Sequence, residues 1–114
     1  MANRKKCDRK IHFAWISDGS KIIASGTNVL LSNGSSIHAE EAALDDLYAK
    51  ISAGKLKARK CRGLNMTVIR INAQGLCISK PCKSCDKQIK RSRIIRHVSW
   101  STGLQDKTFD ESKV

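Results

Sequence analysis

Alternating hydrophobic and polar positions predict most of the strands of this chain. The first two strands flank an Asp-Gly-Ser turn at 18–20, and so short a connection predicts an antiparallel hairpin. The strands expected from the pattern are 11–16, 21–26, 66–71, 76–79 and 94–100. Beyond a turn at 101–103, residues 104–109 are expected to return alongside the last of these as a further hairpin. By periodicity, Phe13, Trp15 and Tyr48 fit core positions.

Helical spacing of apolar residues predicts two helices between these strands. The first follows a loop at 33–36 that ends in serines, which favour helix capping, and its apolar residues recur from Ala43 to Ile51. The second helix is short, begins at Cys82 and turns Ile89 toward the interior. The resulting order is β-β-α-β-α-β with one further strand, and strands that alternate with helices predict an α/β layered domain.

Length and composition predict a single domain over 1–114, with a basic segment at 1–10 and a short tail at 101–114. A hydrophobic fraction of 40% and a charged fraction of 28% are ordinary for a globular protein. No stretch approaches the roughly 18 apolar residues of a membrane span, so no membrane partner is expected. The first residues contain no apolar region typical of a secretory signal, which predicts an intracellular protein of the cytoplasm or nucleus. In such a compartment the five cysteines are expected to be thiols or metal ligands.

The positive charge is concentrated in the second half of the chain. The formal net charge is +12, and the segment 50–96 holds fourteen Lys and Arg against one acid, a net charge of +13. Such a field attracts phosphates, although lysine-rich usage that serves solubility is the other explanation. The candidates for phosphate contact are Lys80, Lys83 and Lys87, beside or on the second helix; a solvated helix face is the alternative for them.

Two short motifs carry candidate chemistry. Cys82 and Cys85 are spaced so that both face one ion from the start of a helix, where the helix field favours their thiolates. His38, at the start of the first helix, adds one imidazole. Three protein ligands that leave a fourth position open are the pattern of catalytic zinc, which lowers the pKa of its water toward about 7. The sequence therefore predicts a Zn²⁺ ion held by these three residues.

Glu40 lies two residues after His38. In the middle of an ideal helix this spacing would turn the two side chains about 200° apart. In the first turn, with the ion beyond the helix end, both can converge on the ion and its water, so Glu40 is the candidate proton shuttle. Alternatives remain for the cysteines: a Cys-x-x-Cys pair alone also fits a redox motif or chance, and Cys77 could close a structural zinc site.

The combination of His38-Ala39-Glu40 with Pro81-Cys82-Lys83-Ser84-Cys85 is typical of zinc-dependent nucleobase deaminases. Over about residues 11–100 the chain resembles the cytidine deaminase-like superfamily. The resemblance implies a three-layer α/β fold whose central mixed sheet has about five strands, with zinc held at two helix N-termini. It also implies hydrolytic deamination, with His38, Cys82 and Cys85 as zinc ligands and Glu40 as the proton shuttle.

The resemblance further implies contacts to the substrate. Asn28 lies in a Gly-x-Asn segment similar to one whose Asn touches the sugar, and the backbones of Ala39 and Ser79 correspond to groups that hold the edge of the base. Trp100 could stack on a base or on a flanking nucleotide. The alternatives are that Asn28 is a turn residue at a strand end and that Trp100 belongs to the core or to an interface between subunits.

The branch of the superfamily stays open, and with it the substrate. Lys80 stands where APOBEC-type members carry Trp, and the short end of the chain is similar to the free-nucleoside and toxin-type branches. The positive charge favours single-stranded DNA or RNA, in which cytosine would be converted to uracil, whereas the short tail and few aromatics favour a free nucleotide or nucleoside (dCMP, CMP or cytidine). The same motif serves purine deaminases, so adenine or guanine stays open as the base. A non-catalytic, zinc-stabilised module that binds nucleic acid is a third hypothesis, which does not need Glu40. A homo-oligomer would help to complete the pocket and cover the sheet.

Overall fold

The computed structural model describes residues 11–30, 32, 36–57, 63–72, 75–104 and 107–114. The elements in chain order are β1 (Ile11–Asp18), β2 (Lys21–Thr27), β3 (Val29–Leu30), β4 (Ser36–Ile37), α2 (Ala39–Ser52), β5 (Leu64–Asn72), β6 (Gly75–Cys77), α3 (Lys83–Ser92), β7 (Ile95–Ser101) and β8 (Phe109–Lys113). Neither of the two described helices is long and apolar enough to cross a membrane.

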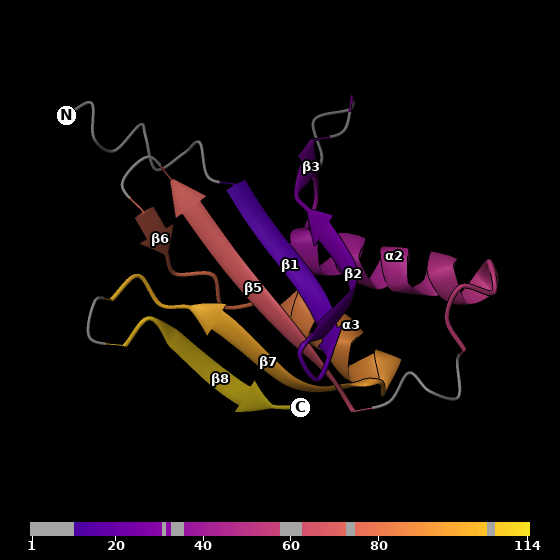
Figure 1. The fold of residues 1–114 in the computed structure, drawn as a ribbon. Coiled ribbons are helices and arrows are strands. Elements are labelled where there is room, and N and C mark those ends of the chain that lie inside the picture. The colour runs from indigo at the N-terminus through magenta and orange to yellow at the C-terminus, as the bar shows by residue number, and fades with distance from the viewer. Residues whose placement is uncertain (1–10, 31, 33–35, 58–62, 73–74, 105–106) are drawn as a thin grey trace.

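The main sheet is mixed and has six strands (Figure 1). Its order is β2-β1-β5-β7-β8, and β6 also pairs with β5. The neighbours are antiparallel except for β5 and β7, which run parallel because α3 lies in the connection between them. β3 and β4 form a separate two-stranded ladder, which the sequence pattern did not predict. The α/β class and the mixed sheet expected from the sequence are confirmed.

One face of the sheet carries the hydrophobic core. Ala14 pairs with Val68, and Met66 pairs with Val98, so these buried side chains point to the same side. Apolar residues of both helices belong to the same buried cluster, Ala43, Leu44 and Leu47 from α2 and Ile89 from α3. Both helices therefore lie on one face (Figure 1), and the described residues form two layers, not the three expected from the sequence.

The opposite face carries residues that were expected in the core. Phe13 and Trp15 alternate with the buried Ala14 and Ile16, so they point away from the helices and stay partly exposed. Trp15 pairs there with Thr67 of β5. The core expectation for Phe13 and Trp15 is therefore wrong, because the helices pack against the small and aliphatic residues of β1. It is also wrong for Tyr48, which is 44% exposed on α2 because that helix turns Leu44 and Leu47 to the core.

Close packing between α2 and β2 depends on Gly26. A Cβ atom at Gly26 would lie 2.5 Å from the backbone nitrogen of Ala43 and 2.6 Å from the Cβ of Ala42. The helix can approach the strand because glycine has no side chain there. Asp46 holds the same two elements together, since its Oδ2 accepts hydrogen bonds from the Ser25 amide and from Lys50 Nζ, each at 3.0 Å.

The first helix begins later than the serines in the loop at 33–36 suggested. Ser36 belongs to β4, and His38 is the N-cap of α2, with extended backbone at φ −74° and ψ 154°. The other serine of that loop lies outside the described residues. This shift matters for function, because it places a candidate metal ligand at the helix end.

The final strand is also displaced from its expected position at 104–109. The antiparallel return is confirmed, but the strand is Phe109–Lys113, paired with β7. The turn before it is longer than the expected turn at 101–103. The Thr102 amide donates a hydrogen bond to the Thr108 carbonyl at 3.0 Å, and Gly103 adopts a φ of +80°.

Candidate metal centre

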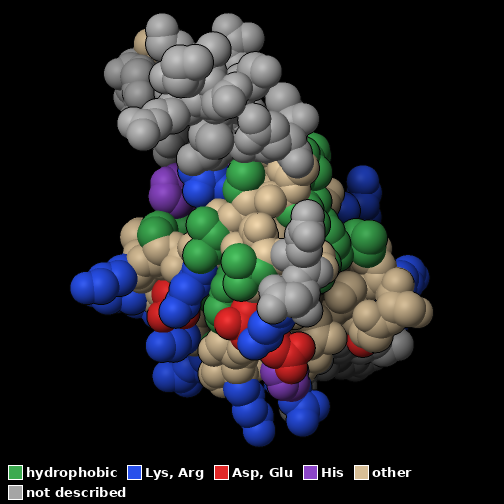
Figure 2. Space-filling model, turned by 90° about the vertical axis from the view of Figure 1, so that its left-hand side faces the viewer, with side chains coloured by type: hydrophobic (Ala, Val, Ile, Leu, Met, Phe, Trp, Pro, Cys, Tyr) green, Lys and Arg blue, Asp and Glu red, His purple; other side chains and the backbone are tan. Residues whose placement is uncertain are grey.

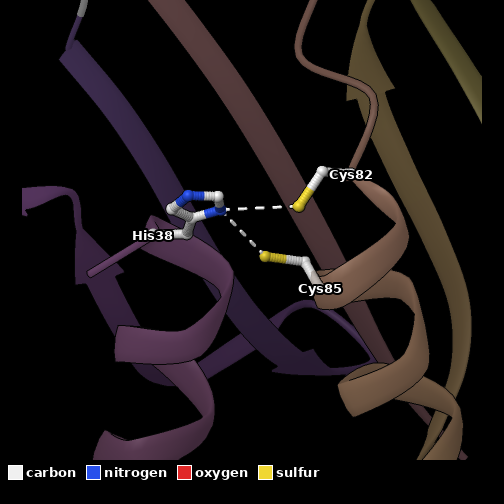
Figure 3. Close-up of side chains that lie close together, drawn as sticks. All are labelled: His38, Cys82 and Cys85. Carbon is white, nitrogen blue, oxygen red and sulfur yellow. Dashed lines mark hydrogen bonds between the residues drawn. The ribbon is translucent and has the colours of Figure 1, made fainter. Parts of the chain in front are cut away.

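The three predicted metal ligands lie at the adjacent ends of two helices (Figure 3). His38 is the N-cap of α2, and Cys82 is the N-cap of α3, with Cys85 in the first turn of α3. Neither N-cap side chain bonds to its own helix. An N-cap side chain that does not cap is left to point off the helix end, and here the side chains point toward one another.

The distances fit one metal ion. His38 Nδ1 lies 3.2 Å from Cys85 Sγ and 3.6 Å from Cys82 Sγ, and all three ligand atoms lie within 4.8 Å of one another. Tetrahedral zinc, with its usual bond lengths, places a nitrogen and a sulfur ligand about 3.6 Å apart. The group of ligands comprises these three residues in the part of the chain that the structure describes, and Cys77 is not among them. The described geometry thus gives no support to Cys77 as a fourth ligand.

The surroundings of Cys85 disfavour its thiolate unless a cation lies nearby. Cys85 is buried, and burial together with the charge of Glu40 raises the pKa of its thiol well above the ordinary value. A divalent metal ion reverses this preference, because it stabilises the thiolate directly. Two sulfurs and one imidazole nitrogen are a donor set that suits zinc.

Glu40 lies in the first turn of α2 and is 5% exposed. Together with His38 and Cys82 it lines a pocket of about 240 Å³. Burial raises the pKa of its carboxyl, and the charge of His38 partly opposes that shift. The structure therefore brings the predicted proton shuttle and two of the metal ligands to one cavity.

We call this cavity the site pocket. Its lining combines the metal-centre residues with polar and basic residues from the ends of β1, β2 and β5 and from the segment before α3. It is lined by His12, Asn28, His38, Glu40, Arg70, Ile78, Ser79, Lys80 and Cys82.

Asn28 lines the site pocket and also joins two strands. Its Oδ1 accepts a hydrogen bond from the His12 amide at 3.1 Å, and its own amide donates to the His12 carbonyl at 3.3 Å. Asn28 therefore has a structural role at the end of β2, and it also borders the pocket.

Ala39 and Ser79 are both buried. Ala39 belongs to the core, and as the first helical residue its amide has no partner within the helix. Ser79 lines the pocket, but its amide donates to the Ser101 carbonyl at 2.9 Å and its hydroxyl donates to the Val68 carbonyl at 2.8 Å. Both donors of Ser79 are thus used to hold the pocket wall.

Trp100 and the predicted phosphate contacts do not all lie at the site pocket. Trp100 is 8% exposed and lines a neighbouring groove instead of the site pocket. Lys80 lines both cavities, and its Nζ lies 5.6 Å from the centroid of the Trp100 ring. Lys83 lines only the groove, whereas Lys87 lines neither cavity.

Sequence reasoning missed two residues of the site pocket, His12 and Arg70. His12 lies two residues before Ala14 in β1, and Arg70 lies two residues after Val68 in β5, so both continue the helix-facing alternation of their strands. A polar residue at the end of such a series was the available signal. Arg70 Nη1 donates to the Ile78 carbonyl at 3.2 Å. Arg70 Nε is buried without a hydrogen bond partner among the described residues.

In comparisons with known proteins, no family model matches this chain, and no curated protein matches it either. The case for a function therefore depends on the geometry of the site.

Proposed function

We propose that the protein is a zinc-dependent hydrolytic deaminase of the cytidine deaminase-like fold, which converts cytosine to uracil in single-stranded nucleic acid. The observation that carries the proposal is the convergence of His38, Cys82 and Cys85 beside the buried Glu40. Two helices that begin beside one pocket, on one face of a mixed sheet, are compatible with that fold.

The chemistry divides between a metal ion and the chain. Zinc, held by the three ligands, would supply Lewis-acid activation of a water molecule at neutral pH. The Glu40 carboxylate would accept a proton from the attacking water and pass it to the departing amine. A carbon–oxygen bond forms at the ring carbon while its carbon–nitrogen bond breaks, so cytosine and water yield uracil and ammonia. The role of Glu40 is the feature that a non-catalytic zinc module would not require.

The walls of the site pocket support a phosphate-bearing substrate. Arg70 and Lys80 bring two cations to a cavity that holds one carboxylate, Glu40. Among the described residues Arg70 Nε has no hydrogen bond partner, so within that part of the chain the hydrogen bonds of this guanidinium are incomplete. Guanidinium groups are well suited to phosphate oxygens, which favours a nucleotide unit over a free nucleoside.

The proposal is tested by uracil formation with the purified, zinc-loaded protein and its Glu40→Ala variant. One panel holds single-stranded DNA, single-stranded RNA, duplex DNA, deoxycytidylate, cytidylate and cytidine. We expect uracil from a single-stranded polymer with the wild-type protein and none with the variant.

The other outcomes decide between the alternatives. Conversion of the monomers alone would make the protein a nucleotide or nucleoside deaminase of pyrimidine salvage. No uracil from any substrate, together with retained binding of nucleic acid, would favour the non-catalytic module. Full activity of Glu40→Ala would overturn the proposed mechanism.

A further inference from the structure

A second groove opens beside the site pocket, on the far side of Lys80. It has a volume of about 330 Å³ and is built from the segment before α3, from α3 itself and from the last two strands. We call it the lysine groove, because Lys80, Lys83, Lys90 and Lys113 all line it. Its other lining residues are Pro81, Asp86, Val98, Trp100, Ser112 and Val114.

The lysines leave the groove with a surplus of positive charge. Asp86 is the acidic side chain in the lining, and its Oδ2 is 3.1 Å from Lys90 Nζ on the same helix. Within the described residues, no ion pair joins Lys80, Lys83 or Lys113 to a carboxylate. Figure 2 shows Lys and Arg side chains along the left-hand and lower edges of one face of the molecule. The charge of Lys80 also acts on Asp110 of β8, so Lys83 and Lys113 carry the surplus among the described residues, which suits a ligand with several negative charges.

Lys80 connects the groove to the candidate reaction centre. It lines both cavities, and its ammonium lies over the Trp100 ring at 5.6 Å, a contact that favours one position of a flexible side chain. Trp100 is largely buried, so it serves as the floor under Lys80 and exposes little ring for stacking. A ligand in the site pocket can therefore extend past Lys80 into the groove.

From this continuity we propose that the lysine groove binds the phosphates of a single-stranded nucleic acid that continues from the site pocket. The inference rests on the proposed function, and it deepens it by assigning the surface that binds the phosphates of the polymer beyond the site pocket. A mononucleotide in the site pocket has no second nucleotide unit to place in the lysine groove. A polymer supplies a phosphate at every nucleotide. Few aromatic side chains are available, so binding depends on phosphate charge more than on base stacking.

The test compares two double variants that change the charge equally. Lys83→Glu with Lys113→Glu alters the groove, whereas Lys21→Glu with Lys57→Glu alters exposed lysines outside both cavities. The probe is a fluorescent single-stranded oligonucleotide with one cytosine, titrated at several salt concentrations. Circular dichroism checks that both variants fold, and the zinc content of each variant is measured in parallel.

We expect the groove variant to bind the oligonucleotide at least tenfold more weakly. Its slope of log affinity against log salt should be shallower by about 1.4, the value for two lost contacts to a single strand. The control variant should bind within twofold of the wild type, and both variants should hold as much zinc as the wild type.

Several results would overturn the inference. These are equal losses in the two variants, unchanged binding by the groove variant, or wild-type protein that does not bind the oligonucleotide. Equal competition by polyglutamate would indicate an acidic protein partner instead. A failure of the proposed function shows up separately, because the binding comparison does not depend on whether uracil forms.

Discussion

At the scale of single residues, the site is built from N-cap side chains that form no hydrogen bond to their own helices. His38 and Cys82 both occupy N-cap positions, where a side chain normally accepts a hydrogen bond from the helix, and neither does so. Glu40 is buried within the first turn of α2, and this burial positions its carboxylate beside the ligands. The local spacing of these residues was enough to predict that they could hold one metal ion, because each motif occupies a single helix start.

Glu40→Gln should lower the rate of cytosine deamination by about 10²–10⁴-fold, because the amide keeps the shape of the side chain and cannot carry the proton. The zinc content per chain should not change, since Glu40 is not a member of the ligand group. Glu41→Gln is the matched control, one residue further along α2 and outside the site pocket. Uracil release and metal content, measured on the same preparations, check the prediction; zinc loss in Glu40→Gln would count against it.

At the scale of elements, the position of α2 decides where His38 and Glu40 lie. The helix packs on β1 and β2, held close by Gly26 and tied to Ser25 by Asp46. These contacts depend on strand register and helix position, so periodicity could predict that the helix exists and not how near the sheet it lies. The β3–β4 ladder and the longer final turn were not predicted either, because each depends on pairing between separate segments, which periodicity does not show.

Gly26→Ala should lower the free energy of unfolding by about 1–3 kcal/mol, because the new methyl group overlaps the backbone of α2. Ser25→Ala, on the neighbouring and exposed position, is the control and should be close to neutral. Urea denaturation of the three proteins measures the difference. A Gly26→Ala protein as stable as the wild type would show that the helix moves away at no cost.

Asp46→Asn should cost about 1 kcal/mol at neutral pH, through weaker hydrogen bonds to Ser25 and Lys50 at a partly exposed site. Desolvation acts to raise the pKa of Asp46, but the Ser25 amide and the Lys50 ammonium outweigh it, so the pKa lies below the ordinary 3.8. A lowered pKa means that this stability is complete above the unfolded value and is lost as the pH falls through the folded one.

Denaturation of wild type and Asp46→Asn between pH 7 and pH 3 checks the sign. The difference between the two proteins should stay constant down to about pH 4 and shrink below it. A difference that grows on acidification would contradict the assigned role of Asp46.

At the scale of the whole molecule, one core on one face of the sheet brings together residues far apart in the chain. Ala14 and Val68 are neighbours in the sheet, and that register extends to His12 opposite Arg70, both in the wall of the site pocket. Sequence alone could not supply this register, so these two residues were missed while the helix-start motifs were found. The opposite face, with Phe13 and Trp15, has no described helix over it, and the homo-oligomer expected from the sequence stays a prediction.

Zinc at the ends of α2 and α3 should stabilise the entire fold, because its ligands join two elements of the same core. At free zinc one hundred times its dissociation constant, the gain in unfolding free energy is about 3 kcal/mol. A strong chelator should therefore lower the melting temperature of the wild type and leave Cys82→Ser unchanged. Serine is a favourable N-cap residue, so that variant should still fold.

Cys77→Ser is the control for this experiment, since its thiol lies outside the ligand group. It should respond to the chelator as the wild type does. A wild-type protein whose melting temperature ignores the chelator would exclude a structural contribution from the metal.

X-ray absorption at the zinc edge, on tag-free protein loaded with one equivalent of zinc, tests the central claim of a three-ligand metal centre most directly. The His38, Cys82 and Cys85 set predicts two sulfur neighbours at about 2.3 Å and two nitrogen or oxygen neighbours at about 2.0–2.1 Å, the latter being the imidazole and a water molecule. Three or four sulfur neighbours, or zinc that the protein does not retain, would contradict it.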